Sequence, residues 1–360
     1  MKIKLLTSIL LVSIFIFLVI FDVLPLQNVP LLRKMKKPKS DIPNLILKED
    51  LSLGGKGEKE NYLFTRIRVD VDDEENLYVL DERLRNVRVF DKNGKFVQTI
   101  GEIGQGPGEF QYPVIFIQVT SKKELVVYDR GLRKFIFYSL NGEYLKQISA
   151  TRLAIPYKIR IDSSENFIGI ILGFPPSLEL KKFNSNLEVL DVFFNKKTDI
   201  EPGYDLRVAE PTVYFALTHD DNIIWGYSDR YELRIVNPDG KTIGKINKNH
   251  KPVRFTKKDK DRYRKIYERI IKPGARLIFP SHFPSFGDIS VDDSNRIFVM
   301  TYKKTSDGRN YYDIFNSEGK YLTRVPLEFS PIIWKNNKVY AIIEAEEGYS
   351  IIKRYTVEWK

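Results

Sequence analysis

The sequence predicts an all-β fold, a six-bladed β-propeller made of four-stranded antiparallel blades and preceded by one N-terminal transmembrane or signal-anchor helix. Two observations predict the propeller: short runs of alternating apolar residues, and a repeat of these runs with a period near 50 residues. The 20 Tyr and 23 Phe of the 360 residues add aromatic side chains that favour strands. We expect the propeller to cover residues 44–360.

Two adjacent segments, residues 68–96 and 117–144, define the repeat. Each contains alternating apolar residues, which are typical of half-buried strands. Each also ends in a hairpin with an Asn-Gly pair, Asn93-Gly94 or Asn141-Gly142, 48 residues apart, which supplies the positive φ of a two-residue turn. Each segment therefore predicts four short antiparallel strands, which make one blade.

Weaker copies of this pattern continue toward the C terminus. They occupy residues 159–186, 215–240, 289–319 and 332–359. The last copy supplies only three strands, so its fourth strand must come from another part of the chain. Residues 44–53 precede a Gly-rich stretch like the one that ends the first blade. We expect them to close the ring as the outer strand of blade six, because an open ring leaves unpaired edges.

An insertion at residues 250–286 is predicted by the wider spacing before the fifth copy. Thr256 can cap a helix in which Tyr263, Ile266 and Tyr267 fall on one face. Two interpretations stay open at this point. The helix is a lid or a partner-binding element, or it is a structural decoration with a solvated basic face.

The N-terminal segment, residues 1–25, is long and apolar enough to span a bilayer as a helix. Phe21, Asp22 and Val23 occupy the place where a cleavable signal needs small residues, which favours an uncleaved anchor. Residues 26–43 read as a basic linker. Their charge favours a cytoplasmic propeller, but long domains translocate largely regardless of charge, so we expect a periplasmic or cell-surface location.

The charge and the cysteine content exclude several classes of function. The net charge is +11, but residues 1–40 carry seven Lys or Arg and one acid, which leaves about +5 on the propeller. We therefore expect no nucleic-acid partner, because such surfaces need a concentrated basic stripe. The chain has no Cys, which excludes disulfides, a thiolate nucleophile and thiolate zinc sites.

Residues 100–113, Ile-Gly-Glu-Ile-Gly-Gln-Gly-Pro-Gly-Glu-Phe-Gln-Tyr-Pro, follow the strand patterns of residues 76–81 and 87–91. This stretch resembles the NHL-repeat family of six-bladed propellers. The match is specific in the first blade and weakens to a pattern of strands and turns further along. The resemblance implies a fold more than an activity, because members mostly bind proteins, RNA or other ligands and a minority are lyases.

Catalytic signatures are weak throughout the sequence. The Gly-rich stretch lacks the Lys-Ser/Thr of a phosphate loop, and Pro107 removes a backbone donor. His219, His250 and His282 do not resemble the three-histidine zinc site of the lyases. We expect no cofactor and no metal, and we favour binding without catalysis. The alternative is a metal-dependent hydrolase or lyase with its site at the central channel.

Three aspartates at strand ends, Asp81, Asp129 and Asp229, support two interpretations. They could join a central metal site as in gluconolactonase-like propellers. More often such residues fix the following turn through side-chain hydrogen bonds to the backbone.

Arginines follow these aspartates, and we expect them to gather at one end of the propeller with nearby aromatic residues. The predicted ligand-binding residues are Arg83, Arg85, Arg130, Arg133, Arg230, Tyr231, Phe110, Tyr112 and Tyr157. Such a face would prefer an anionic protein, peptide or glycan, because guanidinium groups bind carboxylates bidentately. An alternative stays open, in which each arginine pairs with its nearby aspartate as a loop brace. The sequence thus predicts a membrane-tethered, extracytoplasmic binding propeller.

Overall fold

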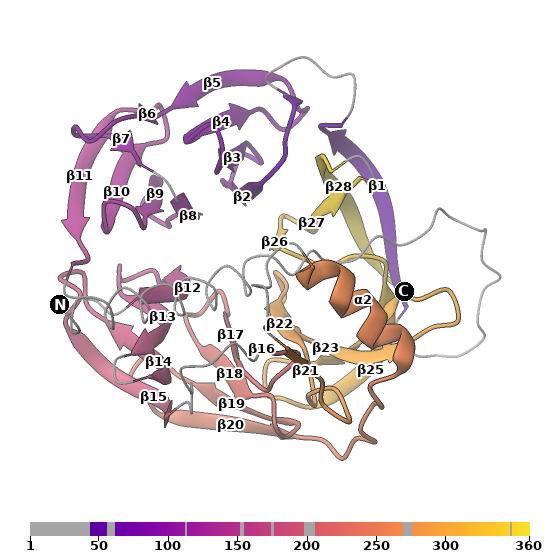
Figure 1. The fold of residues 1–360 in the computed structure, drawn as a ribbon. Helices are drawn as coiled ribbons and strands as arrows, with labels where there is room; N and C mark the ends of the chain where they lie inside the picture. The colour runs from indigo at the N-terminus through magenta and orange to yellow at the C-terminus, as the bar shows by residue number, and fades with distance from the viewer. Residues whose placement is uncertain are drawn as a thin grey trace.

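The computed structural model describes residues 44–55, 62–111, 114–151, 155–173, 176–197, 206–268, 276–345 and 348–360. In these residues six four-stranded sheets form a ring, which confirms the all-β six-bladed propeller (Figure 1). The segments predicted as anchor and linker, residues 1–25 and 26–43, lie outside the described residues. No helix within the described ranges has the length and apolarity needed to cross a membrane.

The first three blades follow one another along the chain, and each runs from the channel outward. Blade 1 contains β2 (Ile67–Val71), β3 (Leu77–Asp81), β4 (Asn86–Phe90) and β5 (Phe96–Ile100). Blade 2 contains β8 (Val114–Val119), β9 (Glu124–Asp129), β10 (Lys134–Ser139) and β11 (Tyr144–Ser149). Blade 3 contains β12 (Ile155–Ile161), β13 (Phe167–Gly173), β14 (Ser177–Phe183) and β15 (Val189–Lys197).

The remaining blades repeat this order, except that blade 6 takes its outer strand from the start of the chain. Blade 4 contains β17 (Val213–Leu217), β18 (Ile223–Tyr227), β19 (Glu232–Val236) and β20 (Thr242–Asn247). Blade 5 contains β22 (Asp288–Val291), β23 (Ile297–Lys304), β24 (Asn310–Phe315) and β25 (Tyr321–Leu327). Blade 6 contains β26 (Ile333–Lys335), β27 (Lys338–Glu344), β28 (Ser350–Trp359) and β1 (Leu45–Leu53). Two short parallel pairs lie between blades: β6 (Glu102–Ile103) with β7 (Glu109–Phe110), and β16 (Leu206–Arg207) with β21 (Leu277–Ile278).

The Asn-Gly pairs lie in turns between the third and fourth strands, as predicted, but these turns are longer than two residues, because the Asp91 amide donates to the Lys95 carbonyl and the Ser139 amide to the Glu143 carbonyl. Gly94 and Gly142 have φ of 80° and 91°, a region in which only glycine is unstrained. The Gly94 amide donates to the Asp91 carbonyl at 2.8 Å, and the Gly142 amide donates to the Ser139 carbonyl at 2.9 Å. The repeated turn residue therefore fixes the register of the outer hairpin in both blades.

The hydrophobic core of the propeller lies between the blades. An apolar cluster occupies each boundary between neighbouring blades, and its members come from both sheets. At the boundary of blades 1 and 2, for example, Leu80 and Val89 pack with Leu125, Val127 and Ile136. Each blade is thus buried on both faces, and no blade can fold as an isolated unit with a covered core.

Strand β1 closes the ring by pairing with β28 in antiparallel register, from Leu45 opposite Trp359 to Leu53 opposite Ile352. The Asn44 amide donates to the Lys360 carbonyl at 2.7 Å, and the return bond from the Lys360 amide measures 3.0 Å. Leu53 is buried in the cluster between blades 6 and 1. The two ends of the described chain therefore complete one sheet together.

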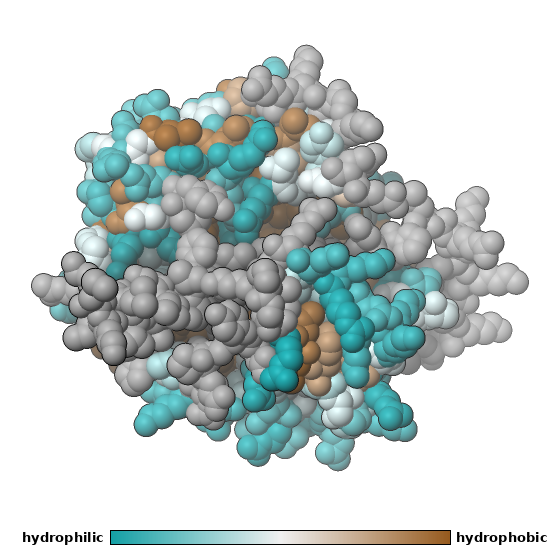
Figure 2. Space-filling view, viewed as in Figure 1, coloured by the Kyte–Doolittle hydropathy of each residue, from teal (hydrophilic) through white to brown (hydrophobic). Residues whose placement is uncertain are grey.

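The insertion contains the predicted helix, α2 (Lys257–Tyr267), which Thr256 and Asp259 cap reciprocally. Tyr263 and Tyr267 are buried against Phe255 and Phe283. The outer side of the helix carries exposed basic residues, and Figure 2 shows a mostly hydrophilic surface there. The packing attaches α2 firmly to the propeller and leaves both interpretations of the insertion open.

We predict that deletion of residues 44–53 abolishes cooperative folding, because β28 loses its partner and the cluster between blades 6 and 1 opens to water. The measurement is thermal unfolding followed by circular dichroism. Deletion of residues 1–39 is the matched control and should leave a cooperative transition. A cooperative transition in the first deletion would contradict the role of β1 in closure.

Candidate functional site

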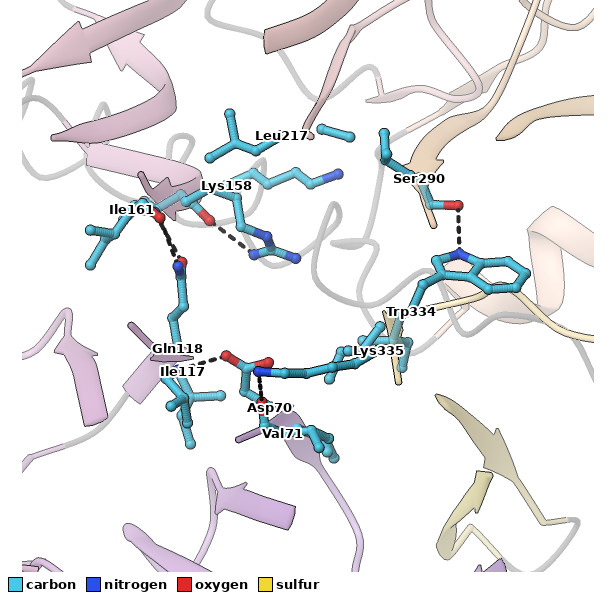
Figure 3. A pocket seen from close by; sticks show the side chains of 18 of the residues that line it. Asp70, Val71, Ile117, Gln118, Lys158, Ile161, Leu217, Ser290, Trp334 and Lys335 are labelled. Atoms are coloured by element: carbon cyan, nitrogen blue, oxygen red, sulfur yellow. Dashed lines mark hydrogen bonds between the residues drawn. The ribbon is translucent and has the colours of Figure 1, made fainter. Parts of the chain in front are cut away.

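The innermost strands of the six blades surround a central channel with a volume of about 1010 Å³. This volume lies at the upper end of the range of small-molecule sites, which is about 300–1,000 Å³. Figure 3 shows charged and amide side chains that project from these strands into the channel. The channel therefore combines room for a ligand with polar groups that could orient it.

The penultimate residue of each inner strand lines the channel at a comparable level. These six residues are Asp70, Gln118, Arg160, Ala216, Ser290 and Trp334, in the order of blades 1 to 6. We call them the belt. Because the inner strands are equivalent by the repeat, the belt allows the six blades to be compared position by position.

Several belt residues connect neighbouring blades, as Figure 3 shows. Asp70 Oδ2 accepts the Val119 amide at 2.7 Å, which joins blades 1 and 2. Gln118 Nε2 donates to the Ile161 carbonyl at 2.8 Å, and Gln118 Oε1 accepts the Ile161 amide at 2.9 Å, which joins blades 2 and 3. Trp334 Nε1 donates to Ser290 Oγ at 3.3 Å, which joins blades 6 and 5. These four side chains brace the ring.

The belt is interrupted between blades 3 and 5. Arg160 Nη1 donates at 2.9 Å to the carbonyl of Ile159, its own neighbour, rather than to blade 4. Ala216 has no polar side-chain atom. Among the described belt residues, no side chain of blade 3 or blade 4 therefore hydrogen-bonds the next blade at this level.

Four further charged groups line the channel around Arg160. Lys158 Nζ lies 3.5 Å from Asp288 Oδ1 across the interruption, from blade 3 to blade 5. Lys335 Nζ donates to the Val71 carbonyl at 3.1 Å and lies 2.8 Å from Asp73 Oδ1 at the channel mouth. The channel lining therefore contains charges of both signs, and most of them are paired.

Enclosure in the channel shifts the ionisation of the central groups. Burial raises the pKa of Asp70, while the Val119 amide and the positive charge of Arg160 act in the opposite direction. Burial lowers the pKa of Arg160, while the charges of Asp70 and Asp288 raise it. Its guanidinium group nevertheless stays charged at neutral pH. Outside the channel, at the boundary of blades 4 and 5, burial raises the pKa of Tyr214 well above its usual value.

The predicted arginines share one end of the propeller but do not form one site. They lie in the loops between the second and third strands of blade 1 (Arg83, Arg85), blade 2 (Arg130, Arg133) and blade 4 (Arg230). Figure 1 shows blades 1 and 4 on opposite sides of the ring. The Arg230 side chain is 80% exposed, with its Nε 3.8 Å from Asp229. All five thus lie at the expected end of the ring, but Arg230 lies across it from Arg83 and Arg85.

The aspartates before these loops hold the loop backbone. Asp81 Oδ1 accepts the amides of Arg83 and Leu84, each at 2.9 Å. Its other oxygen forms an ion pair with Arg88, and both side chains are almost fully buried. Asp129 accepts the amides of Leu132 and Gln111. In these two loops the interpretation as turn-fixing residues is correct.

The predicted aromatic residues have different environments. Phe110 is fully buried with its ring edge-on to Tyr138, and Tyr231 is buried with its hydroxyl donating to Asp313 Oδ2 at 2.8 Å. Neither ring is accessible on the surface, because both fill boundaries between blades. Tyr157 is half-buried and lines the channel. Tyr112 lies outside the described residues.

Metal-binding side chains do not converge in the part of the chain that the structure describes. No three of its His, Cys, Asp or Glu side chains are grouped as a metal site requires. The His219 ring lies 3.4 Å from Asp293 Oδ1, and the His250 ring packs beside Tyr231.

Comparisons with known proteins agree with this architecture. Residues 59–167 match a family model described as a 6-bladed beta-propeller. Protein brain tumor of Drosophila melanogaster is 24% identical over 148 residues, which is 41% of this chain and 14% of that protein. The chain thus spans about one seventh of the length of this curated relative. This protein is an NHL-like six-bladed β-propeller.

Two solved structures from Bacteroides share the fold over most of the chain. One, from Bacteroides fragilis and described as a candidate exported protein, is 14% identical with a TM-score of 0.53, covering 89% of this chain and 96% of that one. The other, from Bacteroides vulgatus, is 10% identical with a TM-score of 0.50, covering 89% and 99%. At these identities the likeness shows the fold alone.

We predict that Asp81→Asn lowers the free energy of unfolding by about 3–5 kcal/mol, because it removes the charge of one partner of the buried Asp81–Arg88 ion pair. The amide oxygen can still accept the Arg83 and Leu84 amides, so the turn itself is retained. Urea unfolding gives the value, and Arg83→Gln at the exposed loop is the control, with an expected change within about 0.5 kcal/mol. Equal stabilities of Asp81→Asn and the control would disprove the buried brace.

Proposed function

We propose that this protein is a membrane-tethered, extracytoplasmic propeller that binds a polar ligand in its central channel without catalysing a reaction on it. The observation that carries the proposal is the channel of about 1010 Å³, lined by Lys158, Arg160, Asp288 and the belt. Ligand sites combine such a volume with a few polar groups that fix orientation. We therefore place the binding site in the channel rather than at the arginine loops.

The tethered location rests on the apolar segment at residues 1–25, which is long enough to span a bilayer as a helix. Asn44 pairs with Lys360 beside the turn at Asn337, at the end of the propeller where first and second strands meet. The insertion helix and the loops between second and third strands lie at the other end. A relative described as a candidate exported protein agrees with an extracytoplasmic location.

Narrowing the channel tests the binding site. Ala216→Phe places a ring at the belt position without a polar side chain, so it should abolish ligand-dependent stabilisation. The measurement is the rise in melting temperature of the full chain in detergent with a panel of sugars, short peptides and organic acids. Val97→Phe, at an exposed position of β5, is the matched control and should respond like the wild type. Equal stabilisation of Ala216→Phe would contradict a channel site, and turnover of the bound ligand would contradict a purely binding role.

The location has its own test. Retention in the membrane pellet under alkaline carbonate, together with digestion of the propeller by protease added outside the cytoplasmic membrane, would support the tethered extracytoplasmic arrangement. Protection from that protease would contradict it.

A further inference from the structure

Arg160 differs from the other cations of the channel in how its donors are used. A guanidinium group offers five N–H donors. Among the described residues Arg160 uses one of them, in the bond from Nη1 to the Ile159 carbonyl. Lys335 bonds Val71 and Asp73, and Lys158 lies beside Asp288. Arg160 therefore retains the largest unused donor capacity among these three cations.

Two carboxylates stabilise the charge of Arg160 but form no ion pair with it. Asp70 and Asp288 both stabilise its charge, yet neither lies close enough to form an ion pair. Asp288 already faces Lys158, and Asp70 receives the Val119 amide. A space that is open to ligands thus separates a guanidinium group on blade 3 from a carboxylate on blade 1.

Arg160 is the only belt residue with a polar side chain that forms no hydrogen bond to a neighbouring blade among the described residues. Its equivalents on the two preceding blades, Asp70 and Gln118, both reach the backbone of the next inner strand. The next strand after Arg160 carries Ala216, whose small side chain leaves room beside the guanidinium group. Tyr157, on the same strand as Arg160, also lines the channel.

We propose, resting on the proposed function, that Arg160 anchors the carboxylate of a hydroxylated organic acid in the channel and that Asp70 accepts a hydrogen bond from one of its hydroxyl groups. The planar guanidinium fork matches a carboxylate bidentately, which a lysine cannot do. Lys335 already contributes positive charge beside the Asp70 carboxylate. A neutral hydroxyl donor therefore suits Asp70 better than a second cation does. An acidic sugar such as galacturonate combines both groups.

The test is isothermal titration calorimetry of the full chain in detergent with galacturonate, galactose and acetate. Galactose keeps the ring hydroxyls without the carboxylate, and acetate keeps the carboxylate without the hydroxyls. We expect galacturonate to bind at least about tenfold more tightly than either, because it alone makes both contacts. Galactose or acetate binding as tightly as galacturonate would overturn the two-point recognition, and no binding of galacturonate at about 10 mM would overturn the ligand class.

Substitution of Arg160 separates anchoring from bracing. Arg160→Gln should weaken galacturonate at least about tenfold and leave galactose unchanged, while Arg160→Lys should give an intermediate affinity, because it restores charge without the fork. The melting temperature of each variant should stay close to that of the wild type, because the hydrogen bond of Arg160 to the Ile159 carbonyl stays within its own strand and does not join two blades. Arg230→Gln, an exposed arginine on the loop of blade 4, is the matched control and should bind normally.

The outcomes distinguish this inference from the proposed function. Equal galacturonate affinity in wild type and Arg160→Gln, with loss of binding in Ala216→Phe, would overturn the anchor and keep the channel. Galacturonate binding that survives in Ala216→Phe would place the ligand outside the channel and overturn both. Loss of binding in Arg160→Gln and retention in Arg230→Gln would support both.

Discussion

The pairing of β1 with β28 is the contact on which the rest of this propeller depends. In a ring of sheets packed face to face, every apolar cluster needs a blade on each side, and here all six boundaries are filled. Blade 6 is complete only when the two ends of the described chain meet in it. Closure also completes the wall of the channel, because Lys335 of blade 6 hydrogen-bonds the Val71 carbonyl of blade 1.

Side chains in the channel serve two purposes that compete for the same positions. A polar group that bonds the next inner strand braces the ring, but its donors and acceptors are then unavailable to a ligand. Gln118 and Trp334 brace the ring in this way, whereas Asp70 does so with Oδ2 alone. Arg160 and Ala216 do not, and the ring accommodates this because the cluster between blades 3 and 4 holds the boundary by apolar packing. The missing hydrogen bond between blades 3 and 4 therefore costs little stability. It leaves the donors of Arg160 available to a ligand.

Much of the fold follows from the sequence, because turn chemistry and strand alternation recur with a period that only a few architectures share. The three-strand final copy also pointed to residues 44–53 as the outer strand of blade six, where the structure places β1. The site was harder to predict. The repeat predicts where Arg83 and Arg230 lie within their blades. It does not predict that these two blades stand on opposite sides of the ring. Burial of Phe110 and Tyr231 likewise depends on contacts made between blades.

Arg160 was missed because a single charge between Ile159 and Ile161 looks like an ordinary solvent-facing strand position. The available signal was its place in an inner strand, where alternation directs side chains toward the channel or a neighbouring blade. Aligning the penultimate residues of all six inner strands would have identified the belt. It could not have shown which members brace the ring, because that depends on distances between blades.

The most direct measurement of the central claim is a crystal structure of the protein soaked with galacturonate. The account predicts the sugar acid inside the channel, with its carboxylate against the Arg160 guanidinium group and a hydroxyl group directed at Asp70. A sugar acid bound at the arginine loops, or an Arg160 side chain turned to the backbone of blade 4 with the channel holding no sugar acid, would contradict it.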